Sequence, residues 1–309
     1  MDNIDVRAAT QRGIAVLNAP GANTVSAAEH TIALLLALVR RIPWAVESMR
    51  AGGWDRKRFA GVELRGKTLG AVGLGRVGTT VAQLARAFGM SVLAHDPYLP
   101  HERAQALGVE LAPLDDVLRR ADVVTLHMPL TDETRYVLNA ERLALLKPGA
   151  VVVNTARGGL VDTDALLEAL EAGRLGGAAL DVFEREPLAQ DSPLRRCVRV
   201  ILTPHLAAST AEAQARVASE ICAAVRDALL TGAVGGAVNV PGVSREALMR
   251  LRGALDLSRR LGRLAAAMHR DPVVRIEVAY GGADEAAPRA TMLAAVEGVL
   301  SAKIGRAHV

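Results

Sequence analysis

The chain has 309 residues, of which 50% are apolar and 23% are charged, and its formal net charge is +4 at pH 7. This length is too great for one small core and predicts two or three domains, while the composition is that of an ordinary globular protein. The pI of about 9.4 raises the question of nucleic-acid binding. However, the net charge is small for this length, and aromatic side chains that stack on bases make up only 3% of the chain. A nucleic-acid partner is therefore not expected.

Cysteine usage and hydropathy exclude several other classes of protein. Cys197 and Cys222 stand alone, without a C-x-x-C pair or a histidine at ligand spacing, so neither a disulfide nor a metal site is predicted. The longest apolar run, Ile32 to Val39, is far too short to span a bilayer. Residues 2–12 carry four charged side chains where a signal peptide needs its apolar core. We therefore expect a cytoplasmic protein with no membrane partner.

The first 18 residues look like the end of a domain. Ala8 to Gly13 predicts a short helix closed by glycine, and Ile14 to Leu17 predicts one strand. One helix and one strand cannot bury a core by themselves. Pro20-Gly21 then breaks the chain.

A long helix is predicted next. Ser26-Ala-Ala-Glu29 is a capping-box pattern that opens it. A role in the core or in dimer packing is favoured for this helix over a ligand site. Trp44 and Trp54 bracket a passage that we expect to be rich in loops. The apolar face of the helix consists of Ile32, Leu35, Leu36 and Val39.

The stretch from Thr68 to Gly78 contains a G-x-G-x-x-G pattern between an apolar strand and a predicted helix over residues 77–88. Gly73 permits the turn, Gly75 lets a pyrophosphate approach the backbone, and Gly78 lets helix and strand pack closely, while the helix start presents N–H groups to phosphate. The next strand ends at Asp96, 18 residues after Gly78. A carboxylate there accepts the ribose hydroxyls of NAD and repels the 2′-phosphate of NADP. The alternative, that Asp96 only opens the turn at Pro97, is compatible with this role.

After the glycine turn, strands and helices alternate. Continuous apolar strands in such an alternation predict an α/β fold with a doubly wound parallel sheet covered on both faces. Ligands bind at the carboxyl ends of such strands. The predicted strands are 91–95, 109–111, 123–127, 150–154, 178–182 and 200–202, and the predicted helices are 104–107, 114–120, 139–146, 163–172 and 209–230.

An arginine, an acid and a histidine follow three of these strands. Arg157, Glu186 and His205 should therefore lie along one edge of the sheet. Oxidation of a hydroxyl needs a base for its proton, and histidine suits that task near neutral pH. A carboxylate orients the imidazole, and arginine grips a substrate carboxylate with paired donors. The alternatives are that Arg157 caps loop carbonyls, that Glu186 is a solvated turn acid, and that His205 is structural. Because the three residues occur together at three strand ends of one sheet, the catalytic interpretation is favoured over these alternatives.

Four motifs together resemble the D-2-hydroxyacid dehydrogenase family. They are Gly73 to Gly78, Asn154 to Gly159, Ala179 to Phe183 continuing through Glu186-Pro187, and Pro204 to Thr210. The resemblance implies a nicotinamide cofactor, NAD, and a small-molecule 2-hydroxy acid substrate. It also implies that Arg157 binds the substrate carboxylate, that His205 is the acid/base and that Glu186, rather than Glu184, is its partner.

The same resemblance implies a set of cofactor-binding residues. The turn and the ribose contact would come from Gly73, Gly75, Arg76, Val77, Gly78 and Asp96. The strand-end and nicotinamide contacts would come from Met128, Pro129, Thr155, Ala156, Arg157, Asp181, His205, Ala207 and Ala208.

Within the family, the chain most resembles the branch that oxidises 3-phosphoglycerate to 3-phosphohydroxypyruvate in L-serine biosynthesis. The glycine-rich linker at 232–236, a helix over Leu255 to Ala267 and a strand over Val273 to Ala279 resemble the intervening domain of the long forms of this branch. Three alternatives remain: a glycerate or hydroxypyruvate type of dehydrogenase, a non-catalytic NAD-binding corepressor of the same fold, and a nucleic-acid binder. The third would need salt-dependent retention on DNA at physiological ionic strength.

By this resemblance the chain is expected to be a fragment, truncated at both ends. The expected parts are 1–18, a remnant of a flavodoxin-like substrate domain; 19–205, the NAD-binding Rossmann domain; 206–232, a helix returning to the substrate domain; 233–302, a partial α/β intervening domain; and 303–309, a non-native tail that fits no element. Because hydride transfer needs a closed cleft, the fragment is expected to bind NAD but to turn over substrate feebly or not at all. A homo-oligomer through the Rossmann domain is expected.

Overall fold

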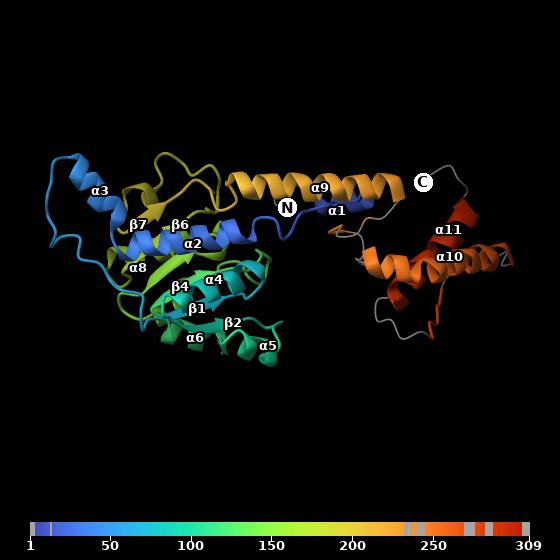
Figure 1. Ribbon diagram of the computed structural model, residues 1–309, viewed down its shortest axis with the longest axis horizontal. Coiled ribbons are helices and arrows are strands. Elements are labelled where there is room, and N and C mark those ends of the chain that lie inside the picture. The colour runs from blue at the N-terminus through green and yellow to red at the C-terminus, as the bar shows by residue number, and fades with distance from the viewer. Residues whose placement is uncertain are drawn as a thin grey trace. The chain divides into compact units, whose positions relative to one another are not determined.

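The computed structural model describes residues 4–12, 14–231, 234, 237–239, 245–268, 276–281 and 287–304. The chain divides into two compact units. One unit is Pro20–Arg216, and the other combines Met1–Ala19 with Val217–Val309. In the first unit the sequence builds a sheet covered by helices (Figure 1), and in the second it builds a packed pair of helices.

The first unit contains a seven-stranded sheet in the order β3-β2-β1-β4-β5-β6-β7, with every neighbouring pair parallel. The predicted doubly wound parallel sheet is confirmed. The residues of β4, β5 and β6 are buried throughout, as expected for strands covered on both faces. The strands are β1 Thr68–Val72, β2 Ser91–His95, β3 Glu110–Leu111, β4 Val123–Leu126, β5 Val151–Asn154, β6 Gly177–Leu180 and β7 Val200–Leu202.

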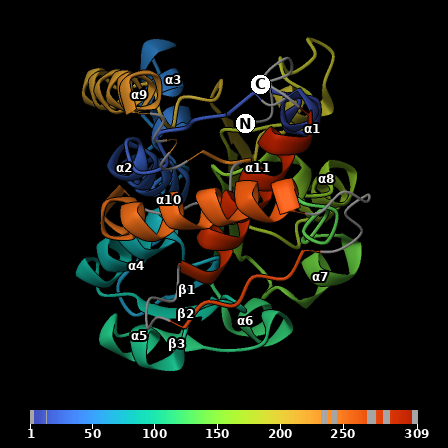
Figure 2. The same ribbon diagram turned by 90° about the vertical axis from the view of Figure 1, so that its right-hand side faces the viewer.

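Helices cover the two faces of the sheet in separate groups, which Figure 2 shows on opposite sides of the strands. Successive strand residues point to opposite faces, so Val152 packs with Leu118 and Leu166, whereas Val153 packs with Leu35 and Val81. α2 and α4 thus cover one face and α6 to α8 the other. The helices are α2 Thr24–Val39, α3 Ile42–Arg50, α4 Arg76–Ala87, α5 His101–Ala106, α6 Leu114–Arg120, α7 Ala140–Leu145 and α8 Thr163–Glu171, with 3₁₀ turns η1 Gly158–Leu160 and η2 Pro193–Arg196.

One prediction about the segment before the sheet is wrong, and another is confirmed only in part. The capping box at Ser26 does not form, because α2 begins at Thr24 and the buried Ser26 hydroxyl donates to the carbonyl of Ala207 at 2.7 Å. The passage expected to be rich in loops begins with α3, which includes Trp44 and follows Arg41 at φ +55°. Residues 51–67, up to the predicted end of this passage at Lys67, contain no helix or strand. A tertiary contact displaced the cap in the first case. In the second, Pro43 in the first turn supplies a helix-starting signal.

The second unit begins with α1 Val6–Gln11. The strand predicted over Ile14 to Leu17 is reduced to a single antiparallel bridge between Leu17 and Ala237. The side chain of Asn239 explains the difference, because it accepts from the N–H of Val16 at 2.8 Å and donates to the carbonyl of Ile14 at 2.8 Å. These bonds satisfy the backbone groups that a neighbouring strand would otherwise pair with.

Two long helices follow in the described part of this unit, after α9 Ala211–Thr231, which spans the boundary between the units. α10 Arg245–Met268 packs on α11 Ala287–Ile304, with Leu251 and Ala290 buried between them. A Cβ at Gly262 would overlap the carbonyl of Ala295, so the two helices approach closely there. α10 extends the helix predicted over Leu255 to Ala267 in both directions.

Two further predictions fall near the end of the chain. Of the strand predicted over Val273 to Ala279, residues 273–275 lie outside the described residues, and residues 276–279 form no strand. The linker predicted at 232–236 lies outside them as well, apart from Val234. α11 includes Lys303 and Ile304, which were expected to fit no element, and residues 305–309 are not described. Among the described helices, none is both long and apolar enough to cross a bilayer.

Candidate active site at the carboxyl edge of the sheet

The turn after β1 depends on two glycines that no other residue replaces without strain. Gly73 has φ +93° and donates its N–H to the carbonyl of His95 at 2.9 Å. A Cβ on Gly73 would lie 2.7 Å from the carbonyl oxygen of His127, and one on Gly78 would overlap the carbonyl of Gly73. The first glycine therefore makes the turn, and the third lets α4 pack against β1.

Gly75 differs from these two because its surroundings are open. A Cβ built there meets no atom within 4 Å, and Gly75 is the N-cap of α4. The first N–H groups of a helix have no partner within it, and they carry the positive end of the helix dipole. The start of α4 at Arg76 and Val77 thus offers donors and space together. This cradle fits the pyrophosphate of a dinucleotide.

Asp96 connects the end of β2 to the glycine turn. Its Oδ2 accepts from the N–H of Leu74 at 2.7 Å, and its Oδ1 accepts from the N–H of Tyr98 at 2.9 Å. The second bond is the turn at Pro97 that the sequence offered as an alternative. The first bond places the carboxylate beside the glycine turn. A carboxylate has about four acceptor positions, so two hydrogen bonds leave capacity for ribose hydroxyls.

The loop after β5 is organised by Asn154, the first residue of the motif Asn154 to Gly159, to which no role was assigned from the sequence. Its side chain is buried, donates to the carbonyl of Arg157 at 2.9 Å and accepts from the N–H of Ala156 at 3.1 Å. Arg157 Nη1 donates to the carbonyl of Ala156 at 2.6 Å, which is the loop-capping role named as its alternative. A guanidinium has five N–H donors, so this bond is compatible with a substrate contact. Thr155 bonds Thr31 of α2 through their hydroxyls at 2.7 Å.

Asp181, directly after β6, holds the loop that carries His205. Its buried carboxylate accepts from the hydroxyl of Thr203 at 2.6 Å and from the N–H groups of Leu206 and Ala207 at 2.8 and 2.9 Å. His30 Nε2 of α2 lies 3.2 Å from the same carboxylate. Burial raises the pKa of Asp181, but these hydrogen bonds outweigh it and lower the pKa below its ordinary value.

His205 lies in this loop with φ +55°, and its N–H donates to the carbonyl of Asp181 at 2.9 Å. Such a backbone conformation is uncommon for a residue with a side chain and is held here by the surrounding bonds. Nδ1 of His205 lies 2.8 Å from Oε2 of Glu186, and the two side chains are 47% and 37% exposed. Both residues line a cavity of about 640 Å³ together with Phe183, Leu202 and Arg195.

Glu184 and Glu186, the two glutamates that follow β6, have different partners. Glu184 accepts from the hydroxyls of Tyr136 and Thr163 at 2.6 and 2.5 Å. Only Glu186 pairs with His205 within the described part of the chain. Because Nδ1 of an imidazole that donates to a carboxylate carries the proton, Nε2 then holds the lone pair. The Glu186–His205 pair can thus accept a proton from a substrate hydroxyl.

The remaining predicted site residues lie along the same edge. A Cβ on Gly158 would overlap the carbonyl of Phe183, so the loops after β5 and β6 pack against each other. Met128 follows β4, and its N–H lies 3.2 Å from the position of a Cβ on Gly73. Pro129 accepts from the Thr134 hydroxyl at 2.7 Å, and Ala208 accepts from the N–H of Thr210 at 3.0 Å.

Comparison with known proteins identifies the family. Residues 32–207 match the family described as D-isomer specific 2-hydroxyacid dehydrogenase, NAD binding domain. The chain belongs to the D-2-hydroxyacid dehydrogenase family. The solved structure of a glyoxylate reductase from Paecilomyes thermophila is similar to this chain, with a TM-score of 0.71, 37% identity, and coverage of 77% of this chain and 72% of that one.

Two curated relatives are named D-3-phosphoglycerate dehydrogenase. The protein from Synechocystis sp. is 46% identical over 303 residues, which are 97% of this chain and 54% of the relative. The protein from Mycobacterium tuberculosis is 48% identical over 309 residues, which are 98% of this chain and 57% of the relative. The D-2-hydroxyacid dehydrogenase chain described here thus spans about half the length of these relatives.

Several residues that position the candidate site lie far from it in the sequence. Ser26, His30 and Thr31 of α2 contact Ala207, Asp181 and Thr155, respectively. In the sequence, these residues indicated only that a helix starts near Ser26. A polar helix face does not reveal which loop it will contact in the fold. The described residues contain no group of three His, Cys, Asp or Glu side chains placed to hold a metal ion.

Proposed function

We propose that this chain provides the catalytic edge for NAD-dependent oxidation of 3-phosphoglycerate to 3-phosphohydroxypyruvate, a step of L-serine biosynthesis. The observation that carries the proposal is the 2.8 Å contact of Glu186 and His205. This pair follows strands parallel to β1, whose carboxyl end carries the glycine turn. Identity of 46% and 48% to two relatives named D-3-phosphoglycerate dehydrogenase supports the substrate.

The proposed chemistry uses residues of this chain in three roles. NAD, when bound, supplies the acceptor for the hydride that leaves C2 of the substrate. Nε2 of His205 takes the proton of the C2 hydroxyl, so that the hydroxyl becomes a carbonyl and the imidazole becomes an imidazolium. Glu186 stabilises that positive charge through Nδ1. Arg157 orients the substrate by pairing with its carboxylate.

The cofactor contacts are part of the same proposal. The glycine turn and the start of α4 would hold the pyrophosphate, and Asp96 would accept the ribose hydroxyls, which favours NAD over NADP. Asp181 and Thr155 already use their side chains to hold loops, so their contribution on the nicotinamide side would come in addition to those bonds. The other proposed contacts are Met128, Pro129, Ala156, Arg157, His205, Ala207 and Ala208.

Assembly and location also remain proposals. We infer a homo-oligomer through the sheet-containing unit, with α3 as its contact surface. Ile42, Val46 and Met49 of α3 are 48%, 42% and 53% exposed, and no residue of this helix is buried. The division of the chain outside residues 32–207 into substrate-domain and intervening-domain parts is proposed on the resemblance alone, and so is a cytoplasmic location.

NADH formation tests the proposed reaction. The chain, and a longer protein that contains it, would be assayed with 3-phosphoglycerate, D-glycerate and D-lactate at saturating NAD. We expect the longer protein to prefer 3-phosphoglycerate and His205→Asn to lose activity while it keeps its NAD affinity. A preference for D-glycerate would show that 3-phosphoglycerate is not the substrate, but it would leave the proposed mechanism unchanged. NAD binding without NADH formation from any 2-hydroxy acid would contradict the proposed dehydrogenase activity and would favour a non-catalytic, NAD-binding corepressor.

A further inference from the structure

Two side chains of α2 contact the loop at residues 203–207, which carries His205 and is called the histidine loop below. The hydroxyl of Ser26 donates to the carbonyl of Ala207 at 2.7 Å. His30 Nε2 lies 3.2 Å from the hydroxyl oxygen of Thr203. The helix therefore contacts the loop on both sides of the histidine.

The two side chains are placed to act together. Ser26 and His30 are four positions apart on α2, so both lie on the same face of the helix. Ser26 is 4% exposed, and the side chain of His30 is 20% exposed. Water competes little for hydrogen bonds in such surroundings, so these bonds hold the loop more firmly than surface bonds would.

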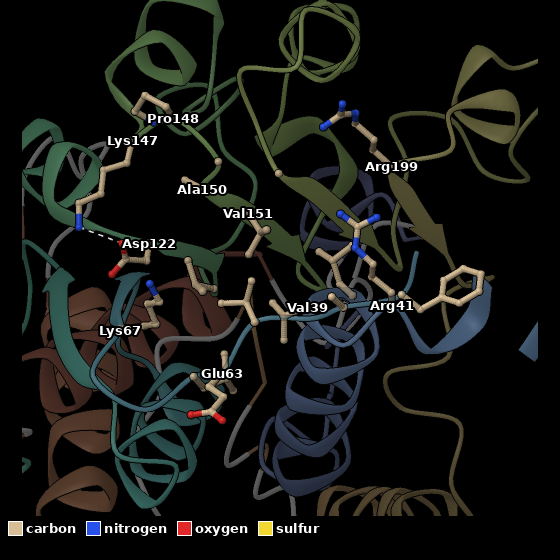
Figure 3. Close-up of a pocket in the computed structure, with 18 of the residues that line it drawn as sticks. Val39, Arg41, Glu63, Lys67, Asp122, Lys147, Pro148, Ala150, Val151 and Arg199 are labelled. Carbon is tan, nitrogen blue, oxygen red and sulfur yellow. Dashed lines mark hydrogen bonds and ion pairs between the residues drawn. The ribbon is translucent and has the colours of Figure 1, made fainter. Parts of the chain in front are cut away.

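α2 is itself held by the sheet from one edge to the other. Leu35 packs in one buried cluster with Val153 of β5 and Ala179 of β6. The end of the helix lies at the opposite edge of the sheet, where Val39 lines the same pocket as Val151, the first residue of β5 (Figure 3). The helix is thus a rigid support for the bonds that its first turns make to the histidine loop.

The histidine loop needs such a support because of its backbone. His205 has φ +55°, which is uncommon for a residue with a side chain and persists only where the surrounding structure holds it. Asp181 holds the loop from the strand side, because its carboxylate accepts from the N–H groups of Leu206 and Ala207. His30 Nε2 also lies 3.2 Å from Oδ1 of this carboxylate. One imidazole of α2 thus contacts both the loop and the residue that anchors it.

We propose that Ser26 and His30 are positioning residues that act together as a clamp on the histidine loop. They hold the backbone of His205 so that Nδ1 stays against Glu186 and Nε2 is directed at the substrate hydroxyl. This role rests on the proposed dehydrogenase function and extends it, because it makes proton transfer depend on a helix outside the loops of the carboxyl edge. The cradle at Gly75 belongs to another loop, so NAD binding does not depend on the clamp.

Solvent isotope effects on NADH formation test the clamp in a longer protein that contains this chain. Ser26→Ala and His30→Leu should each lower kcat about tenfold. Each should also raise the ratio of kcat in water to kcat in deuterium oxide, because proton transfer becomes the slower step. A variant that only has fewer folded molecules loses kcat but keeps the wild-type ratio. His30→Gln keeps an N–H donor near the position of Nε2, so it should restore most of kcat and the wild-type ratio.

NMR of labelled imidazole nitrogens gives a second readout, which uses this chain and needs no turnover. In alkaline buffer, wild-type His205 should hold its proton on Nδ1, the atom that faces Glu186. Ser26→Ala and His30→Leu should each shift this signal toward a mixture of the two tautomers. The matched control is His101→Gln, because His101 is exposed at the start of α5. The control should leave the isotope ratio and the His205 signal as they are in the wild type.

Two results would overturn the proposal. The first is a kcat or an isotope ratio that stays at the wild-type value in both Ser26→Ala and His30→Leu, and the second is a wild-type His205 signal in both. Ser26→Ala removes only one oxygen atom, so it decides the test if His30→Leu fails to fold. If the longer wild-type protein forms no NADH from any 2-hydroxy acid, the proposed function fails, and the NMR comparison alone decides whether the clamp exists.

Discussion

Oε2 of Glu186 lies 2.8 Å from Nδ1 of His205, although the two residues come from different loops and are 19 positions apart. Oε1 of the same carboxylate accepts from the N–H of Phe183 at 3.1 Å, which fixes its orientation. On the other side, Asp181 holds the backbone of the histidine loop. Both partners of the pair are thus positioned before any substrate is present.

Glu186→Gln should lower kcat on the order of 100-fold and leave NAD affinity nearly unchanged. The amide keeps the shape of the side chain but removes the charge that stabilises an imidazolium. The matched control is Glu184→Gln, because Glu184 bonds Tyr136 and Thr163 instead. Steady-state kinetics on a longer protein that contains this chain would measure both variants. An equal loss of kcat in the two variants would contradict the assignment.

Asp96→Asn should shift cofactor preference toward NADP. The amide oxygen still accepts from Leu74 or Tyr98, while the charge that repels a 2′-phosphate is gone. We expect the ratio of the Kd values for NADP and NAD to fall about tenfold or more. Titration of both cofactors by fluorescence would measure this ratio. If the ratio stays constant, Asp96 acts only in the turn and not on the ribose.

Replacing Gly78 and Gly75 of the turn by alanine, one at a time, should show that the first glycine is needed for protein stability and the second for NAD binding. Gly78→Ala places a Cβ on the carbonyl of Gly73, so it should lower the free energy of unfolding by about 1 to 3 kcal/mol. Gly75→Ala meets no protein atom within 4 Å, so it should keep the Tm and weaken NAD binding by blocking the phosphate. Thermal unfolding and NAD titration would compare them. A large loss of Tm in Gly75→Ala would contradict the open cradle.

The sheet was predictable because its strands are short apolar runs bounded by turn residues. β7 and α6 match the predicted ranges residue for residue, since each is set by local sequence. The strand predicted at residues 14–17 failed because a strand depends on its partner. There, the side chain of Asn239, 223 positions from Val16, takes the place of a neighbouring strand.

The site was predictable to the extent that parallel strands bring their carboxyl ends to one edge. The order of residues along the chain placed Arg157, Glu186 and His205 on that edge, and the resemblance selected Glu186 over Glu184. The network behind them was not predictable, because His30 and Asp181 are 151 positions apart. Hydrogen bonds between residues so far apart leave no periodic pattern in the sequence.

Asp181→Asn should destabilise the protein at neutral pH by about 1 to 3 kcal/mol. The amide replaces one carboxylate oxygen with a donor, which then faces the N–H group of either Leu206 or Ala207, because these two groups bond different oxygens of Asp181. Because the pKa of Asp181 is lowered in the folded state, its stabilisation is present above its ordinary pKa of 3.8 and is lost as the pH falls below that value. Urea unfolding at pH 7 and at pH 3 would show a smaller difference at pH 3. The same difference at both values would exclude the charge as the cause.

His127→Gln should flatten the acid dependence of stability. His127 lies behind the glycine turn, with Nε2 2.9 Å from the hydroxyl of Thr125, and burial lowers its pKa from 6.5 to about 4. Between these values the unfolded chain binds one proton more than the folded chain, so the free energy of unfolding falls with decreasing pH, by up to about 1.4 kcal/mol per unit. Glutamine still bonds Thr125 and does not titrate. Urea unfolding at pH 7, 6 and 5 would give both slopes, and equal slopes would show that His127 is solvated in the folded state.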